Sequence, residues 1–192
     1  MPPKVKVTKE EIINTTIELV RTSGQDSINA RAIASSLNCS TQPIFSNFNS
    51  MEELEQSTIL AAYEIYLNFI KNEVESNKYP KYKAFGMAYI RFAKDEKELF
   101  KLLFMRDRSG EEASLSPDFE ESVKMIMQAN NVSYETANQM HFELWACVHG
   151  LGTMLATSFM PLEWEVISDI LSDVYQGIRL IHSSEVNDNV CN

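Results

Sequence analysis

Small polar side chains gather in one short stretch near the N-terminus. Its hydroxyl and amide residues are Ser40, Thr41, Gln42, Ser46 and Asn47. Such groups form hydrogen bonds with the edges of DNA bases: Gln pairs with adenine through two bonds, and Thr donates to a base or touches a thymine methyl. These residue types therefore suit the reading of DNA. The alternative is a three-helix cap on a bundle, with polar residues that are simply solvated.

Three short helices are expected to position these side chains. Thr8-Lys9-Glu10-Glu11 has the form of a capping box, and Gly24 ends the helix that begins there. Asn29 is expected to cap a second helix, and Ser40 a third that tolerates Pro43 in its first turn. Two short helices joined by a tight turn form a helix-turn-helix, which presents the N-terminal turn of its second helix to base edges.

Charge is distributed unevenly along the chain. The net charge is -10, but residues 1–50 hold five basic and four acidic groups, so they carry +1 and the remainder carries -11. Non-specific binding to nucleic acid depends on many contacts between Lys or Arg and phosphate. The balance therefore excludes a protein that coats DNA with its whole surface, and it assigns any DNA contact to the N-terminal segment.

The rest of the chain also has helical periodicity. Ser50-Met51-Glu52-Glu53 is a second capping box, which opens a long helix to about residue 77. Further helices are expected at about 85–94, 96–105, 117–130, 134–159 and 162–182, followed by a frayed polar tail. The sequence thus predicts an all-α protein of about nine helices, with an N-terminal three-helix domain, 1–49, and a C-terminal helical bundle domain, 50–192.

The composition is that of an ordinary globular protein. Of the 192 residues, 44% are hydrophobic and 23% charged, and no stretch approaches the ~20 apolar residues that span a bilayer. The first residues lack the apolar segment of a secretory signal, and Cys39, Cys147 and Cys191 have neither disulfide-framework nor zinc-ribbon spacing. We expect a cytoplasmic protein with no membrane partner, no cofactor and no metal site.

Residues 8–54, and especially 30–54, resemble the DNA-binding segment of the tetracycline-repressor (TetR) family. The family pattern runs R-x-I-A-x-x-x-x-V-S-x-x-x-L-Y-x-H-F-x-x-K-E-x-L. Direct matches are Arg31, Ile33, Ala34, Ser40, Phe48, Glu52 and Leu54, and Ile44 and Phe45 match conservatively. The resemblance implies DNA binding by 1–49, with ligand sensing and dimerisation by 50–192. The implied function is a ligand-responsive transcriptional regulator, a repressor, that binds a palindromic operator as a homodimer.

The resemblance also implies a set of DNA-binding residues. They are Arg31, Ser40, Thr41, Gln42, Pro43, Phe45, Ser46, Asn47 and Lys9. Three positions depart from the family, which usually has Tyr, His and Lys, groups that touch phosphate, where this chain has Phe45, Asn47 and Met51. Asn47 can still donate a hydrogen bond, but Phe45 lacks the hydroxyl of tyrosine and Met51 lacks the ammonium of lysine. We therefore expect low non-specific affinity for DNA.

In the family the last two helices pair with those of a second subunit, which implies a homodimer formed through residues 134–182. Small residues at helical spacing, Ala146, Gly150, Thr153 and Thr157, form a stripe on the first of these helices, where another helix can approach closely. The same stripe would also serve packing within one subunit. A two-fold dimer reads two DNA half-sites, whereas a monomeric helix-turn-helix reads only a few base pairs.

Aromatic residues in the middle of the chain supply a candidate effector site. They are Tyr63, Tyr66, Phe85, Tyr89, Phe92, Phe104, Phe142, Trp145 and His149. By default each single one of them is an ordinary core residue, and the site as a whole rests on the resemblance. The run Trp145-Ala-Cys-Val-His149-Gly150 resembles a W-x-x-x-H-G feature in the sensor domain of one TetR subgroup, which favours a small-molecule effector.

Two other functions remain open on the sequence. An enzyme would use His141, His149 or a nearby carboxylate, but the chain has no nucleophile elbow, phosphate-binding glycine loop or metal-ligand cluster. The two histidines are eight residues apart, which on a helix separates them by ~12 Å, too far to share one metal ion. We therefore expect no enzyme. The second alternative is a helical protein-interaction module with a degenerate DNA-binding domain.

Overall fold

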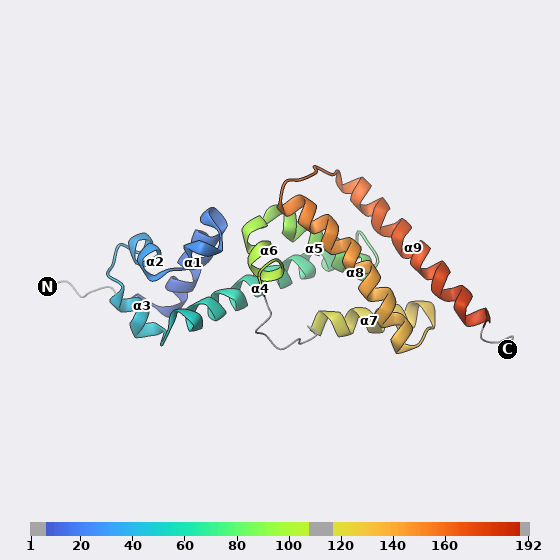
Figure 1. The fold of residues 1–192 in the computed structure, drawn as a ribbon, viewed down its shortest axis with the longest axis horizontal. Coiled ribbons are helices and arrows are strands. Elements are labelled where there is room, and N and C mark those ends of the chain that lie inside the picture. Colours follow the sequence, from blue (N-terminus) through green and yellow to red (C-terminus); the bar gives the residue numbers. More distant parts are fainter. Residues whose placement is uncertain (1–6, 108–116, 189–192) are drawn as a thin grey trace. The chain divides into compact units, whose positions relative to one another are not determined.

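The computed structural model describes residues 7–107 and 117–188, and Figure 1 shows its helices. These are α1 (Lys9–Ser23), α2 (Ala30–Ser36), α3 (Gln42–Asn47), α4 (Met51–Glu75), α5 (Lys81–Asp95), α6 (Lys97–Phe104), α7 (Pro117–Asn130), α8 (Tyr134–Ala156) and α9 (Trp164–Asp188), with a 3-10 turn at Gln25–Ser27. The described residues contain no strand. The predicted all-α class is confirmed.

The chain forms two compact units. Unit 1 comprises Met1–Asn68 and Asp95–Asp107, and unit 2 comprises Phe69–Lys94 and Arg108–Asn192. Helix α4 is shared, since its first part belongs to unit 1 and its last residues to unit 2. The predicted boundary at residue 49 separates a DNA-binding domain from a ligand-sensing and dimerisation domain. It is a division by function, and it stays a prediction.

Helix α1 begins and ends where the sequence predicts. The Thr8 hydroxyl accepts a hydrogen bond from the Glu11 backbone N–H (3.1 Å), and the Thr8 N–H donates to the Glu11 carboxylate (2.8 Å). This reciprocal capping box satisfies N–H groups that have no partner within the helix. At the other end Gly24 has a φ of 75°, which glycine adopts without strain.

The starts of α2 and α3 differ in kind. Asn29 caps α2 as expected, because its side chain accepts from the Ala32 N–H (2.9 Å). The expectation that Ser40 caps α3 is wrong. The residue before α3 is Thr41, whose backbone is already helical and whose side chain makes no capping bond. Pro43 lies in the first turn, as predicted, where its missing N–H removes no helical bond.

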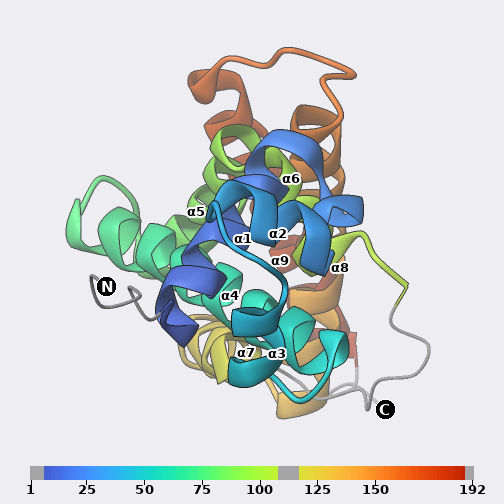
Figure 2. The same ribbon diagram turned by 90° about the vertical axis from the view of Figure 1, so that its left-hand side faces the viewer.

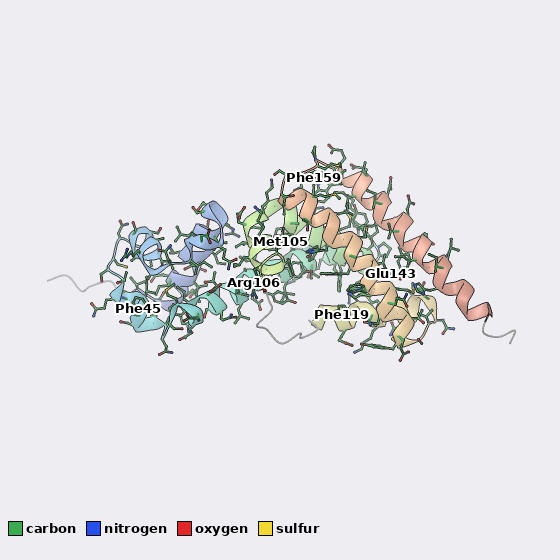
Figure 3. All side chains as sticks on the ribbon, in the orientation of Figure 1. Phe45, Met105, Arg106, Phe119, Glu143 and Phe159 are labelled. Carbon is green, nitrogen blue, oxygen red and sulfur yellow. The ribbon has the colours of Figure 1, made fainter. Side chains whose placement is uncertain are left out.

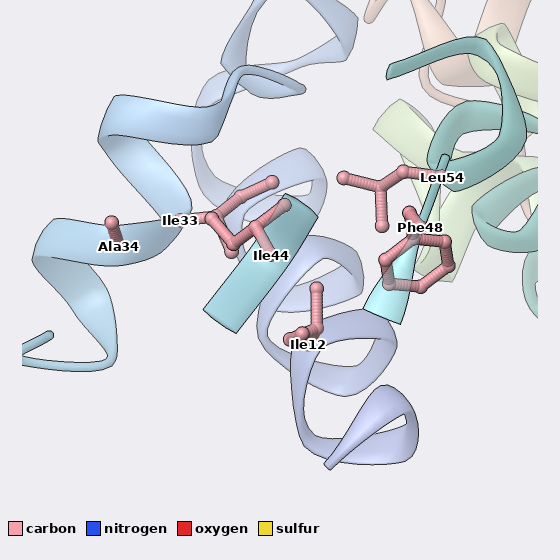
Figure 4. Close-up of a cluster of buried hydrophobic side chains, with 6 residues drawn as sticks. All are labelled: Ile12, Ile33, Ala34, Ile44, Phe48 and Leu54. Carbon is pink, nitrogen blue, oxygen red and sulfur yellow. The ribbon is translucent and has the colours of Figure 1, made fainter. Parts of the chain in front are cut away.

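One apolar cluster holds α1, α2, α3 and the start of α4 together (Figure 4). It consists of Ile12, Ile33, Ala34, Ile44, Phe48 and Leu54, all of them buried. The spacing of Ile33 and Ala34 on α2 and of Ile44 and Phe48 around α3 directs one side of each short helix inward. Their opposite sides are thereby left to solvent.

An ion pair adds to the apolar contacts between α1 and α6 in unit 1. The Arg21 guanidinium donates to both carboxylate oxygens of Glu96, over 2.9 Å and 2.7 Å. Such a two-pronged pair fixes orientation as well as distance. The hydrogen bonds to Glu96 raise the pKa of Arg21 above its ordinary value, so the charge persists.

Unit 2 has two apolar clusters. One joins α5, α8 and α9 through Met87, Ile90, Leu151, Leu155, Ile167 and Leu171, and the other joins α7 and α8 through Val123, Ile126, Ala137, Met140 and Leu144. Gly86 of α5 lies at a close approach, since a Cβ there would be 3.3 Å from Val148 and 3.4 Å from Leu171. The missing side chain lets these helices pack tightly.

Several helices end on a left-handed residue. Asn38, Asn77 and Asn131 follow α2, α4 and α7 with φ values of 49°, 53° and 53°, and Ser158 follows α8 with 56°. Asparagine tolerates this conformation better than most residues other than glycine.

The last helix differs from its predicted bounds. Helix α9 begins at Trp164 rather than at 162, and it continues to Asp188. The expectation of a frayed tail after residue 183 is therefore wrong for 183–188. Neither Gly nor Pro occurs in that segment, so polarity alone does not interrupt the helix. The final residues, 189–192, lie outside the described part of the chain.

Candidate functional site

Helices α2 and α3 of unit 1 form a helix-turn-helix. Backbone bonds close the turn between them: the Asn38 N–H donates to Ser35 O (3.1 Å) and the Cys39 N–H to Ala34 O (3.0 Å). Both helices contact α1, and Figure 2 views the molecule from the end that carries α1, α2 and α3. The expected helix-turn-helix is thus present.

The outer side of α3 carries the polar residues singled out from the sequence. Gln42, Phe45 and Ser46 are exposed, as is Ser40 before the helix, whereas Thr41 and Pro43 are half-buried. Gln42, Phe45 and Ser46 share one face because residues three and four apart are neighbours on a helix. The Phe45 side chain, labelled in Figure 3, is 55% exposed. This surface, which we call the α3 face, consists of Ser40, Gln42, Phe45 and Ser46.

Asn47 uses its amide hydrogens inside unit 1. Its Nδ2 donates to the backbone oxygen of Pro43 (2.7 Å) and to that of Val7 (3.2 Å). The second bond ties the end of α3 to the segment that precedes α1. An amide with both hydrogens engaged has only its carbonyl oxygen left for a ligand.

Lys9 is also engaged. Its ammonium lies 3.0 Å from the Glu53 carboxylate and 4.7 Å from the centre of the Phe48 ring. Hydrogen bonds from the Asn49 backbone N–H and from Lys9 lower the pKa of Glu53, which keeps this carboxylate charged. The positive charge of Lys9 is therefore largely compensated within the protein.

Arg31 is the one cationic side chain of α2 and α3, two helices that the structure describes completely. It is exposed and lies in the first turn of α2. Lys4 and Lys6, two further basic residues near the N-terminus, lie outside the described residues. The described helix-turn-helix thus presents polar and aromatic groups with little positive charge.

Most of the aromatic candidates for an effector site pack against other rings. In unit 1, Tyr66 packs against Tyr63 and against Phe104, with ring centres 5.7 Å and 5.4 Å apart. In unit 2, Phe92 packs edge-on against Phe69, and Phe85 lies beside the Lys81 ammonium. These residues pack as ordinary apolar side chains do.

A second group in unit 2 combines stacking with hydrogen bonding. On α8, the Trp145 ring stacks on the His149 ring, with ring centres 5.0 Å apart and an interplanar angle of 16°. The Phe142 ring stacks on Trp145 in turn, with ring centres 6.3 Å apart. Nδ1 of His149 lies 2.8 Å from the hydroxyl of Tyr89 on α5. Phe142 and Trp145 are exposed, whereas Tyr89 is buried. We call Phe142, Trp145 and His149 of α8, together with Tyr89 of α5, the α8 aromatic row.

Burial keeps both hydrogen-bonding members of the row uncharged. It raises the pKa of Tyr89 far above its ordinary value and lowers the pKa of His149. The charged form of each group is disfavoured away from water. A neutral imidazole beside a neutral phenol suits contact with an uncharged polar group better than contact with a strong acid.

The sequence analysis missed a second pair of the same kind. The hydroxyl of Tyr82 lies 2.9 Å from Nδ1 of His141, and Phe119 of α7 packs edge-on against that histidine at 4.5 Å. Tyr82 precedes Tyr89 by seven residues and His141 precedes His149 by eight, so both partners recur after about two helical turns. This repeated spacing of a tyrosine and a histidine is the sequence signal from which the Tyr82–His141 pair could have been predicted.

Neither a metal site nor a membrane span is found where the structure can be described. Among the side chains of 7–107 and 119–182, no group of three or more His, Cys, Asp or Glu is placed to hold a metal ion. Over the same ranges, no helix combines the length and the apolar character that crossing a bilayer requires.

Helices α8 and α9 expose apolar surface in unit 2. The exposed large side chains are Tyr134, Phe142, Trp145 and Met154 on α8 and Val166, Leu180 and Ile181 on α9. Between them lie Gly150 and Gly177, where an added Cβ would meet nothing within 4 Å. Unlike Gly86, these two glycines are not required by packing inside the subunit.

Comparison with known proteins finds similarity at the level of the fold. No family model and no curated protein matches the chain. A solved structure of a TetR family member from Streptomyces coelicolor A3 is similar with a TM-score of 0.60 and 15% sequence identity, over 86% of this chain and 96% of that one. The nine described α-helices, with a helix-turn-helix near the N-terminus, therefore form a TetR-like fold.

Proposed function

We propose that the chain is a ligand-responsive transcriptional regulator of the TetR type, a repressor that binds a palindromic operator as a homodimer in the cytoplasm. The observation that carries the proposal is the helix-turn-helix of unit 1, whose α3 face is polar and exposed within a TetR-like fold. In this role the N-terminal half of α3 enters the major groove. Gln42 then reads a base edge, and Arg31 contacts phosphate.

Dimerisation through residues 134–182 is supported by the outer faces of α8 and α9. A glycine in an exposed helix costs about 1 kcal/mol relative to alanine, so two of them without an internal packing role call for another reason. Close approach of a second copy at Gly150 and Gly177, with the exposed apolar side chains on either side, supplies that reason. The dimer places two α3 helices for two half-sites.

The effector site is proposed at the α8 aromatic row. A small molecule that binds one arrangement of the helices better than another shifts the population toward it. A coupling of ~1 to 3 kcal/mol changes DNA affinity by roughly 5- to 150-fold, which is enough for regulation. The exposed parts of the Phe142 and Trp145 side chains supply apolar contact, and the Tyr89–His149 pair supplies polar groups.

The DNA-binding proposal is tested by incubating the purified protein with random duplexes at moderate salt and sequencing what it retains. Wild type is expected to enrich near-palindromic sequences, and Gln42→Ala to lose the enrichment. Gln56→Ala, an exposed glutamine on α4, serves as the matched control and should behave as wild type. A folded protein that enriches no sequence would refute the regulator.

The dimer is tested separately by light scattering after size exclusion. Gly150→Leu is expected to yield monomers, because a large side chain prevents close helix approach at a position where a Cβ meets nothing in its own subunit. Ala129→Leu, at an exposed position of α7, should leave the mass unchanged. A dimer that survives both Gly150→Leu and Gly177→Leu would place the interface elsewhere.

The helical protein-interaction module keeps one specific observation in its favour. Lys9 is paired with Glu53, and Arg31 is the one cation on the fully described α2 and α3. A protein that no longer binds DNA would show this depletion of free positive charge. The duplex selection separates the two functions, since only the regulator enriches sequences.

A further inference from the structure

Phe45 is the one large apolar side chain exposed on α1, α2 and α3, all of which the structure describes completely. Its neighbours Ile44 and Phe48 are buried in the core of unit 1, so the core is already filled on the inner side of α3. Phe45 does not belong to the apolar cluster of unit 1. An isolated apolar residue on a surface is common, but this one lies on the α3 face between Gln42 and Ser46.

The residues around Phe45 leave little else for base recognition. The Ser46 hydroxyl donates to the backbone oxygen of Gln42 (2.9 Å), and both amide hydrogens of Asn47 go to backbone oxygens. Ser40 before the helix keeps its hydroxyl, but among Gln42, Ser46 and Asn47 on α3 it is Gln42 whose side-chain donors the described part of the protein does not use. Phe45 lacks a hydroxyl, so it provides no hydrogen bond to phosphate.

We propose that Phe45 is a specificity determinant that packs against the 5-methyl group of a thymine in the major groove. This inference rests on the proposed function. Thymine is the only base that presents a methyl group there, and an apolar side chain recognises it by contact. Gln42, one helical turn away, is suited to the N6 and N7 atoms of an adenine. Each half-site then contains neighbouring A·T pairs, one read through Gln42 and one through Phe45.

Recognition of a methyl group by Phe45 and attraction of cations to phosphate differ in how they depend on salt. A phenylalanine contact with a methyl group is insensitive to salt, whereas phosphate contacts weaken as salt rises. The helix-turn-helix has one exposed cation on α2 and α3, so a larger share of the discrimination between sequences falls to Gln42 and Phe45.

The test uses duplexes selected by the wild-type protein and removes single methyl groups. Each thymine of the half-site is replaced in turn by uracil, which keeps every hydrogen-bonding group and lacks only the 5-methyl. Affinity is measured by fluorescence anisotropy for wild type, for Phe45→Ala and for Leu60→Ala. Leu60 is 66% exposed on α4 and is the control for loss of an exposed apolar side chain.

One uracil position is expected to weaken wild type and Leu60→Ala by about fourfold per half-site, which corresponds to ~0.8 kcal/mol for one methyl group. Phe45→Ala should bind the thymine and uracil duplexes equally. If no uracil position weakens wild type, or if Phe45→Ala is weakened as much as wild type, the inference is wrong while the proposed regulator stands. If wild type selects no duplex, the proposed function fails and this inference with it.

Discussion

The hydroxyl of Tyr89 on α5 lies 2.8 Å from Nδ1 of His149 on α8, and the histidine ring is stacked against Trp145. The pair joins the two helices through neutral groups, since burial raises the pKa of Tyr89 and lowers that of His149. Unit 2 thus has a link between α5 and α8 that depends on the protonation of one imidazole.

Acid should destabilise unit 2 through His149. The unfolded chain takes up a proton at this residue near pH 6.5, about the ordinary value for histidine, while the folded state holds it at a lower pKa. Below pH 6.5 the unfolded state therefore binds more protons, so the free energy of unfolding falls as pH is lowered toward the folded pKa. Denaturation at pH 7 and pH 5.5 should show a smaller loss in His149→Gln than in wild type. Equal losses in the two proteins would contradict this.

The glycines of unit 2 should respond differently to alanine. Within one subunit Gly150→Ala fills open space and gains helix propensity, so at protein concentrations low enough to give monomers its free energy of unfolding should rise by about 1 kcal/mol. Gly86→Ala gains the same propensity but brings its Cβ to 3.3 Å from Val148, which must shift. Chemical denaturation at one protein concentration should place Gly86→Ala below Gly150→Ala. Equal stabilities would mean that α5 has room to move.

Asn47 should contribute to stability more than Gln42 does. Asn47→Ala removes both hydrogen bonds to the backbone oxygens of Pro43 and Val7, and its free energy of unfolding should fall by roughly 1 to 2 kcal/mol. Gln42→Ala, at an exposed position, should stay within about 0.5 kcal/mol of wild type. Thermal and urea denaturation measure both. An unchanged Asn47→Ala would show that water replaces these bonds without loss.

Releasing Lys9 should steepen the salt dependence of DNA binding. Glu53→Gln removes the carboxylate that lies 3.0 Å from the Lys9 ammonium, so the charge becomes available to a phosphate. One further phosphate contact changes the slope of log K against log salt by about 1. Titration of a selected duplex from low to moderate salt gives the slope. Glu55→Gln, on the same helix, is the control, and identical slopes for both variants would show that Lys9 does not reach DNA.

Local signals predicted most of the fold. The capping residues Thr8 and Asn29 lie where the sequence suggested, and each side chain accepts from a backbone N–H three residues later. These signals act within one helical turn, so they can be recognised without knowledge of the packing. The error at Ser40 has the same origin: the type of residue fits a cap, but the backbone at Thr41 is already helical.

The candidate sites were less accessible to sequence reasoning. The residues of the α3 face could be named, because an amphipathic helix divides into an inner and an outer side. The hydrogen bond of Asn47 to Val7 and the ion pair of Lys9 with Glu53 could not, since their partners lie 40 and 44 residues away in the sequence. The Tyr82–His141 pair, 59 residues apart, depends likewise on how α5 and α8 pack.

Three of the helices stop at an asparagine in a left-handed conformation rather than at a glycine. Glycine would relax the backbone at Asn38, Asn77 and Asn131, but it would also widen the range of conformations open to the denatured chain. The asparagine side chain at each of these helix ends limits the conformations that the denatured chain can adopt. The turns after α2, α4 and α7 therefore favour the native state partly by making its competitor less disordered.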